Sequence, residues 1–276
     1  MKPTMRFDIL TIFPGFFDGF LTHGVVRRAL ETGIVQCERH DLRDFTIDRH
    51  RTVDDRPFGG GEGMVLKPEP LAAAIESIAV SAKAERDHAR ESVILLSAQG
   101  EPFTQAVARE LAQLERIVLI CGRYEGVDER VNTLFCDREL SIGDYVLTGG
   151  ELAAAIVMDA TTRLLPGVLR NEASSAYESF GVADAGASEG GEPPRSTHGS
   201  GGLLDYPHYT RPAEFRGLAV PEVLCGGDHA AIRKWRREQA LLKTLRNRPD
   251  LLKNADLSAS DRAFLDPTGS ADRADD

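Results

Sequence analysis

The chain has 276 residues, of which 42% are apolar and 28% are charged, and its formal net charge is −10. This balance is ordinary for a globular protein of about two domains, and it argues against indiscriminate binding of nucleic acid. No apolar run approaches the roughly 20 residues of a membrane span, and the N-terminus lacks the apolar segment of a secretory signal. The four cysteines stand far apart without zinc-finger spacing, which indicates reduced thiols in a cytoplasmic protein.

The first part of the chain alternates predicted strands and helices. Strands are expected over residues 6–13 and 34–40, and helices over 16–31 and 68–85. Residues 41–64 form a polar, glycine-rich loop without the Gly-Lys-Ser/Thr ending of a P-loop. No Gly-x-Gly-x-x-Gly follows a strand either, which disfavours a dinucleotide-binding fold.

Two continuous apolar runs, 93–96 and 117–120, flank a predicted helix over 104–114. Continuous rather than alternating runs are typical of strands buried on both faces of a parallel sheet. Small and polar residues follow each run, at 97–100 and 121–126. Since ligands of open parallel sheets bind outside the carboxyl ends of the strands, these two segments are candidate walls of a pocket.

A third candidate wall is 141–150, within the stretch 140–152 that reads Leu-Ser-Ile-Gly-Asp-Tyr-Val-Leu-Thr-Gly-Gly-Glu-Leu. Its three glycines let backbone groups face a ligand, and Thr148 is a plausible N-cap for a helix expected over 152–165. The residues alone leave two interpretations open. The three segments converge on one pocket, or they are three ordinary turns between strands and helices.

The composition changes after Leu169. Residues 172–202 are rich in Ala, Ser, Gly, Glu and Pro and are expected to form a mobile linker. Asp228 is expected to cap a helix over 229–247, with an apolar stripe and a basic face. The stripe comprises Ile232, Trp235, Leu242 and Leu245, and the basic face comprises Arg233, Arg236 and Arg237. Ten Lys and Arg against six Asp and Glu over 205–253 make this region basic, so the face is either solvated or in contact with phosphate.

Several motifs together carry a resemblance to a known family. They are Phe13-Pro14, Asp54-Asp55 with Gly59-Gly60-Gly61, 96–100, 122–126, 141–151, 166–169, 209–212 and Gly227-Asp228-His229. In this order and spacing, they resemble the bacterial tRNA (guanine-N1)-methyltransferases of the TrmD type, in the SPOUT superfamily. The resemblance runs from about residue 5 to residue 253, apart from the linker. These enzymes methylate the guanosine 3′ of the anticodon, at position 37.

The resemblance implies an α/β fold in which a SPOUT-type parallel sheet carries a deep trefoil knot, followed by a small helical domain. The expected parts are a methyltransferase domain (1–169), a linker with an insertion (170–204), a tRNA-binding domain (205–256) and an acidic, disordered tail (257–276). It also implies a homodimer with the active site at the subunit interface, the tRNA anticodon arm as partner, and a possible dependence on Mg²⁺.

The methyl donor implied by the resemblance is S-adenosyl-L-methionine, held mainly by backbone groups of the three strand-end segments. The implied binding residues are Leu95, Leu96, Ser97, Gly122, Tyr124, Glu125, Ser141, Ile142, Gly143, Asp144, Tyr145, Val146, Leu147, Gly149 and Gly150. Many relatives carry an aromatic residue where this chain has Leu95, but the contact is expected to be through the backbone.

The catalytic pair implied by the resemblance is Arg163 and Glu178. Glu178 stands where Asp is usual, and it is expected to accept the N1 proton of guanine while Arg163 stabilises negative charge on O6. Without the family, Glu178 is a solvated linker acid and Arg163 pairs with Asp159 one helical turn away. The insertion over 181–201 is longer than in most relatives, and either slows ordering of the linker or simply loops out.

Three alternatives compete with this hypothesis. A SPOUT enzyme that methylates a ribose 2′-hydroxyl would share the knot segments but not Glu178 or the 209–212 segment. A non-catalytic RNA-binding module would show decayed segments or lack Arg163. A phosphate-binding protein using 59–63 is disfavoured because Lys, Ser and Thr are missing there.

Overall fold

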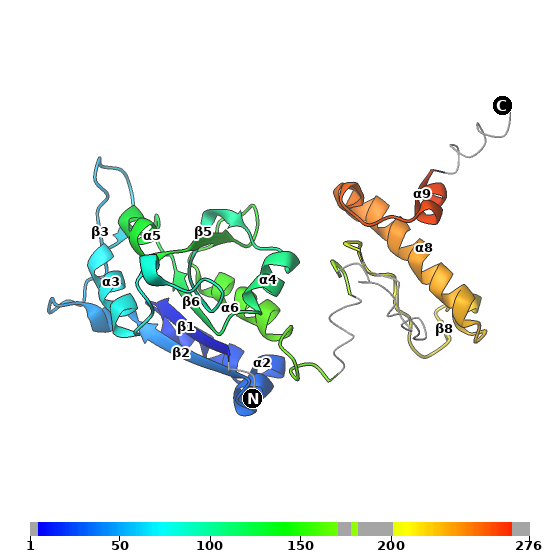
Figure 1. Cartoon of the computed structure of the whole chain (residues 1–276), viewed down its shortest axis with the longest axis horizontal. Coiled ribbons are helices and arrows are strands. Elements are labelled where there is room, and N and C mark those ends of the chain that lie inside the picture. The colour runs from blue at the N-terminus through cyan, green and yellow to red at the C-terminus, as the bar shows by residue number, and fades with distance from the viewer. Residues whose placement is uncertain (1–4, 171–177, 182–200, 267–276) are drawn as a thin grey trace. The chain divides into compact units, whose positions relative to one another are not determined.

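The structure, a computed structural model, describes residues 5–170, 178–181 and 201–266. The chain divides into two compact units, Met1–Arg170 and Asn171–Asp276 (Figure 1). Among the described residues, no helix combines the length and apolar character needed to cross a membrane. All four cysteines are free thiols, as predicted, and burial raises the pKa of Cys37 and Cys136 to about 12.

The first unit is built on a five-stranded parallel sheet with the strand order β2-β1-β6-β5-β7. The strands are β1 (Met5–Thr11), β2 (Val35–Asp41), β5 (Glu91–Pro102), β6 (Arg116–Cys121) and β7 (Arg138–Ser141). A separate antiparallel pair joins β3 (Asp54–Asp55) to β4 (Val65–Leu66). The apolar runs predicted as buried parallel strands are therefore confirmed, and β5 and β6 lie near the middle of the sheet.

Helices cover both faces of this sheet. They are α1 (Asp18–Leu21), α2 (Gly24–Glu31), α3 (Pro68–Ser77), α4 (Gln105–Leu111), α5 (Glu129–Phe135) and α6 (Glu151–Thr162). Side chains of α2, α4 and α6 share one apolar core with one face of the strands, and those of α3 and α5 share a second core with the other face. The unit is a three-layer α/β/α arrangement, consistent with the expected α/β class.

The structure corrects several predicted element boundaries. In place of the helix expected over 16–31, the structure has a short 3₁₀ turn (Pro14–Phe17), α1 and α2, and the positive φ of 66° at Gly24 interrupts the helical path between α1 and α2. The strand expected to end at Leu96 continues to Pro102 after an irregularity, so 97–100 is a bulge within β5. Thr148 does not cap α6, whose N-cap is Gly150. Local signals did not reveal β7 or α5.

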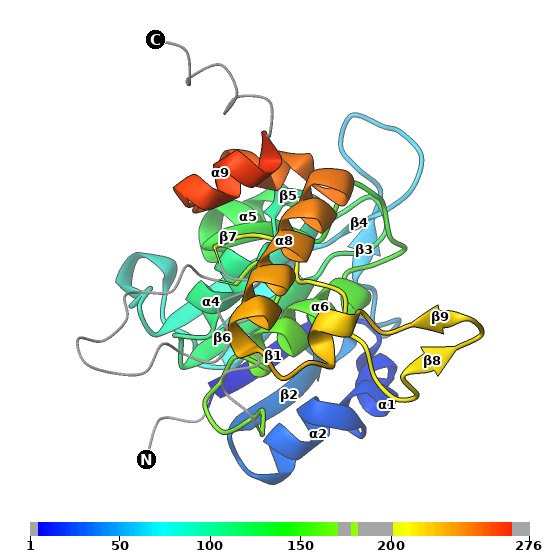
Figure 2. The ribbon, with the colours of Figure 1, turned by 90° about the vertical axis from the view of Figure 1, so that its right-hand side faces the viewer.

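The second unit is organised around one long helix, α8 (His229–Asn247). Its bounds agree with the prediction, and the Asp228 carboxylate accepts hydrogen bonds from the backbone N–H groups of Ala230 and Ala231, as expected of an N-cap. Other elements are the β8–β9 hairpin (Glu214–Phe215 and Leu218–Ala219), two 3₁₀ turns (Glu222–Leu224 and Pro249–Lys253) and α9 (Ala259–Leu265). Figure 2 shows α9 beside one end of α8 and the hairpin projecting near the other.

Two expectations for this unit are wrong. The side of α8 that is buried carries Ala240, Leu241 and Thr244, whereas Leu242 and Leu245 of the predicted stripe are exposed. Residues expected in the disordered tail form α9, which starts with a Ser258–Asp261 capping box. The rest of the tail, 267–276, lies outside the described residues.

The buried carboxylate of Asp8 links three strands of the sheet through hydrogen bonds. It accepts hydrogen bonds from Arg6 on its own strand, from Arg116 on β6 at 2.9 Å, and contacts His40 Nε2 on β2 at 2.8 Å. Burial by itself raises the pKa of the Asp8 carboxyl, but the hydrogen bonds from His40, Arg6 and Arg116 outweigh it and hold this pKa well below its usual range. The charged form of Asp8 therefore stabilises the fold.

Asp8→Asn is expected to lower the free energy of unfolding by about 3 kcal/mol at pH 7, because two arginines lose a buried counter-charge. Since the folded-state pKa is depressed, the stabilisation is complete above the unfolded value of about 4 and is lost as pH falls below it. Urea unfolding at pH 7 and pH 3 measures this, and the difference between wild type and variant should shrink at pH 3. Asp44→Asn, at the exposed pair with Arg51, is the control and should change stability little. A pH-independent difference would contradict the assignment.

Candidate active site

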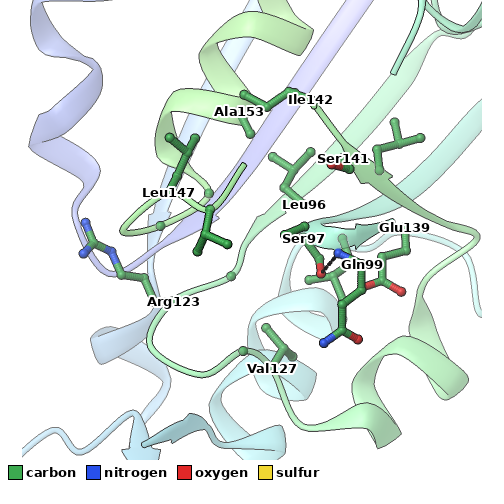
Figure 3. A pocket seen from close by; sticks show the side chains of 18 of the residues that line it. Leu96, Ser97, Gln99, Arg123, Val127, Glu139, Ser141, Ile142, Leu147 and Ala153 are labelled. Atoms are coloured by element: carbon green, nitrogen blue, oxygen red, sulfur yellow. Dashed lines mark hydrogen bonds between the residues drawn. The ribbon is translucent and has the colours of Figure 1, made fainter. Parts of the chain in front are cut away.

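A cavity of ≈ 320 Å³ opens at the carboxyl end of the sheet, within the size range of small-molecule sites (Figure 3). Its walls come from the bulge of β5, the segment after β6 and the loop between β7 and α6, so the three predicted segments do converge. Thirteen of the fifteen predicted binding residues line it: Leu95, Leu96, Ser97, Gly122, Tyr124, Glu125, Ser141, Ile142, Tyr145, Val146, Leu147, Gly149 and Gly150. Gly143 and Asp144 belong to the same loop but do not line the cavity.

Backbone contacts bind the second and third walls together. The N–H of Gly150 donates to the carbonyl of Gly122 at 2.8 Å, and Arg123 forms a β-bridge with Gly149. A Cβ on Gly150 would lie 2.7 Å from the Cα of Cys121 and 2.9 Å from the nitrogen of Gly122. Since these are backbone atoms that cannot move aside, glycine is required where α6 starts.

The third wall is also held by its own side chains. Ser141 Oγ accepts from the N–H of Gly143 at 3.3 Å, and the hydroxyl of Tyr145 donates to the carbonyl of Ile142 at 3.2 Å. Gly143 has a φ of 149°, and a Cβ there would lie 2.6 Å from the Tyr145 ring. The glycine therefore allows the tyrosine to fold back over its own loop.

Acidic side chains give the cavity a negative character. Glu125, Glu129 and Glu139 all line it, and the amide of Asn132 donates to Glu139 at 3.2 Å and to Glu129 at 3.3 Å. Three carboxylates in one cavity favour a cationic ligand. Among the described residues, no group of three or more His, Cys, Asp or Glu is arranged to hold a metal ion.

Ten further residues line the cavity. Five of them fall within the predicted wall segments, namely Ala98, Gln99, Arg123, Gly126 and Thr148, and five lie outside those segments, namely Val127, Glu129, Glu139, Leu140 and Ala153. Glu139 was missed because β7 is short and begins with two charged residues, so it lacks the apolar run that marks the other strands. Glu129 is the first residue of α5, just after the glycine-rich segment. Prediction of this helix from the sequence would have identified Glu129 as a candidate lining residue.

The glycine-rich loop before β4 also reaches the cavity wall. The N–H of Glu125 donates to the carbonyl of Met64 at 2.9 Å, and the N–H of Leu66 donates to the carbonyl of Gly126 at 3.0 Å. A Cβ on Gly63 would lie 2.3 Å from Glu125 Oε1. The end of this loop is thus hydrogen-bonded to the wall, rather than being a free element as its composition suggested.

Arg163 lies at the C-cap of α6, and its N–H donates to the carbonyl of Asp159 at 3.1 Å. It does not line the cavity. By helical spacing it follows Leu152, Ile156 and Asp159 on one side of α6, and all three of those residues are exposed. Arg163 is therefore presented on the outward side of the helix that leaves the cavity.

Glu178 belongs to the second unit, in a turn closed by a hydrogen bond from the N–H of Gly181 to the carbonyl of Glu178 at 3.0 Å. The N–H of Phe180 donates to the carbonyl of Leu203, and the N–H of Asp205 donates to Ser179 Oγ, both at 2.9 Å. Leu203 is fully buried. The described part of the predicted linker is therefore held without RNA; the remainder, 171–177 with Tyr177 and the insertion residues 182–200, lies outside the described residues.

This segment is in turn attached to α8. The N–H of Leu204 donates to Thr244 Oγ1 at 3.0 Å, and the Thr244 hydroxyl donates to the carbonyl of Ala240 at 2.7 Å. Thr244 is fully buried. A continuous set of hydrogen bonds thus runs from the turn that carries Glu178 to the long helix of the second unit.

The basic face of α8 is partly occupied by contacts within the unit. Arg237 forms an ion pair with Asp261 at 2.8 Å, and the guanidinium carbon of Arg236 lies 4.9 Å from the centre of the Tyr206 ring. These two side chains therefore have structural roles, and Arg233 is the member of the predicted face for which a phosphate contact stays a prediction.

Comparisons with known proteins agree with this geometry. The family model for tRNA (guanine-1)-methyltransferase TrmD matches residues 5–254. A protein of Koribacter versatilis named tRNA (guanine-N(1)-)-methyltransferase is 58% identical over 261 residues, which cover 95% of this chain and 97% of that protein. Proteins of the same name from Geobacter sulfurreducens and Geobacter metallireducens are 54% and 52% identical, over 95% of this chain and 96% of each. The chain belongs to the tRNA (guanine-1)-methyltransferase TrmD family.

Proposed function

We propose that the protein transfers a methyl group from S-adenosyl-L-methionine to N1 of guanosine 37, the nucleoside 3′ of the anticodon in tRNA. The family match over residues 5–254 supports a tRNA (guanine-N1)-methyltransferase. The observation that carries the choice of methyl donor is the cavity formed by three glycine-bearing segments with acidic side chains.

The residues around the cavity fit the proposed donor. When bound, S-adenosylmethionine supplies a methyl group on a positively charged sulfur. Glu125, Glu129 and Glu139 give the cavity the opposite charge, and the glycines at 122, 149 and 150 leave backbone groups open to an adenosine. The described residues do not form a cluster of His, Cys, Asp or Glu suited to hold Mg²⁺, so the proposed reaction assigns no role to this ion.

Two side chains carry the proton and charge steps of the proposal. Glu178 accepts the proton from N1 of guanine as a general base, and Arg163 stabilises the negative charge that develops on O6. The target base is stacked in the anticodon arm, so it must be extruded at a cost of a few kcal/mol. The hydrogen-bonded turn at 178–181 supports the role of Glu178, since it limits the backbone conformations of the segment that carries this residue before RNA binds.

The proposal includes a homodimer whose active site lies between subunits. The exposed side of α6 carries Leu152 and Ile156, which are 50% and 44% exposed, in line with Arg163. Phe16, in the 3₁₀ turn that packs against α6, is 45% exposed as well. A second copy covering this apolar side would enclose Arg163, which supports an active site completed by the partner.

The finer fold and the RNA contacts also belong to the proposal. A trefoil knot at the cavity is supported by the chain path, because the segment after the edge strand β7 returns past Gly122 to place α6 against β1 and β6. Phosphates of the anticodon arm would meet Arg233 and Arg211 in the basic region 205–253. Both side chains lie in the region where basic residues exceed acidic ones.

The test is methyl transfer from labelled S-adenosylmethionine to an unmethylated tRNA transcript, followed by nuclease digestion and mass analysis. We expect 1-methylguanosine at position 37, and no product from a matched transcript that carries adenosine there. A 2′-O-methylated nucleoside would replace this proposal with the ribose-methylating alternative. Binding of tRNA without any methyl transfer would replace it with the non-catalytic RNA-binding module.

A further inference from the structure

A chain of polar side chains joins the end of β1 to the start of α6, beside the cavity. The hydroxyl of Thr11, the last residue of β1, donates to Glu151 Oε1 at 2.8 Å. Glu151 is the first residue of α6 and is 2% exposed. Its second carboxylate oxygen lies 3.4 Å from Arg123 Nε. Neither Thr11 nor Glu151 lines the cavity, so any effect they have on a ligand acts through other groups.

Arg123 connects this chain to the cavity wall. Its backbone lies in the wall and pairs with Gly149 across to the third segment. Its side chain points away from the cavity, as Figure 3 shows. The guanidinium carbon lies 4.5 Å from the centre of the Phe13 ring, within the range of a cation–π contact. The guanidinium is therefore held between Glu151 and Phe13, on the outer side of the wall.

The double glycine at the start of α6 fits around this ion pair. A Cβ on Gly149 would lie 2.4 Å from Arg123 Nε and 2.5 Å from Glu151 Oε2. The ion pair thus passes directly over the Cα of Gly149. Two cavity walls and the helix that carries Arg163 meet at this single point.

The free-energy cost of burying the Glu151 carboxylate suggests that this residue does more than fill space. A buried carboxylate is costly unless it is paired and hydrogen-bonded, and here the start of α6 adds the favourable end of the helix dipole. Segments rich in glycine lose much conformational freedom when they become ordered around a ligand. A charge pair that orders two such segments in advance removes part of that cost from ligand binding.

We propose that Glu151, together with Arg123 and Thr11, is a positioning residue for the cofactor site. The ion pair holds the walls at 122–126 and 143–150 at the separation that binds S-adenosylmethionine, without contacting it. This inference rests on the proposed function, because it takes S-adenosylmethionine as the ligand of the cavity.

The test compares Glu151→Gln with wild type in S-adenosylmethionine binding by calorimetry and in steady-state methyl transfer. Glutamine keeps the shape of the side chain and removes its charge. We expect the Kd and the KM for S-adenosylmethionine to rise about tenfold, with kcat at saturating donor within about twofold. Arg123→Gln should have a similar effect, and the double variant should bind no more weakly than the weaker single variant, because the pair acts as a unit.

Asp8→Asn is the matched control. Like Glu151, Asp8 is a buried carboxylate paired with arginine, but it lies on β1 and neither lines the cavity nor contacts its walls. It should lower the melting temperature and leave the Kd unchanged. If Glu151→Gln does not fold, Thr11→Val replaces it in the test. Valine removes the hydroxyl that donates to Glu151 and keeps the ion pair, so the Kd for S-adenosylmethionine should rise about threefold.

Three outcomes would overturn the inference. One is a Glu151→Gln protein that melts at a lower temperature but binds S-adenosylmethionine as wild type does. Another is a double variant whose loss of affinity equals the product of the two single losses, which would make the residues independent. Failure of the wild type itself to bind S-adenosylmethionine would overturn the proposed function, and this inference with it.

Discussion

Replacing Glu178 with glutamine is expected to slow methyl transfer about a thousandfold, while the affinity for S-adenosylmethionine stays unchanged. An amide has nearly the shape of the carboxylate but cannot accept the N1 proton of guanine. The turn at 178–181 is held by backbone hydrogen bonds and by the Ser179 hydroxyl. Because glutamine has nearly the size and shape of glutamate, the second unit should stay folded while the proton acceptor is lost.

Single-turnover methylation with saturating enzyme and donor measures this effect on the chemical step, and calorimetry measures donor affinity separately. Glu178→Asp is the matched control, because it restores the residue that is usual in the family and keeps the charge. We expect it to stay within about tenfold of wild type, since the shorter side chain shifts the carboxylate by one methylene. A glutamine variant with the wild-type single-turnover rate would move the general base to another group.

Arg163→Met is expected to lower the single-turnover rate about a hundredfold, because developing charge on O6 of guanine would lose its electrostatic stabilisation. Methionine keeps much of the length and apolar stem of arginine, so packing at the end of α6 should survive. Arg163→Lys keeps the charge but not the planar guanidinium, and an intermediate rate is expected. Equal rates for Met, Lys and wild type would show that Arg163 has no part in the chemical step.

The same variant tests whether each active site is shared between subunits. Co-expression of Arg163→Met and Glu178→Gln chains with different tags allows purification of the mixed dimer. If Arg163 of one subunit acts with Glu178 of the other, one of the two sites contains both native residues. About half of the wild-type activity is then expected. A mixed dimer as inactive as its parents would mean that each site is built within one chain.

Much of the architecture could be predicted because its signals are local. Continuous apolar runs over 93–96 and 117–120 indicated two buried parallel strands, since such strands have apolar neighbours on both faces. Asp228 marked the start of α8 because a short acidic side chain satisfies the free N–H groups there. Three strand ends rich in small residues were candidate walls of one pocket, and the cavity lies at those segments.

Other features could not be predicted because neighbouring residues do not encode them. β7 is short and begins with charged residues, and it is a strand only because β5 lies beside it. The buried side of α8 was misread because Leu242 and Leu245 are apolar yet exposed, while Ala240 and Thr244 face inward. Which side of an amphipathic helix is buried depends on what packs there, and periodicity alone does not specify it.

By itself, then, the sequence determined the α/β class, the long helix of the second unit, the family, and the segments that form the cavity. Only the tertiary structure decided how those segments are held. Thr11 and Glu151 are 140 positions apart and meet through one hydrogen bond, and Arg123 joins them because β6 lies next to β1. The Gly-Gly pair at the start of α6 was visible as a motif, but its physical reason was not. A side chain there would strike an ion pair and a backbone that come from distant parts of the chain.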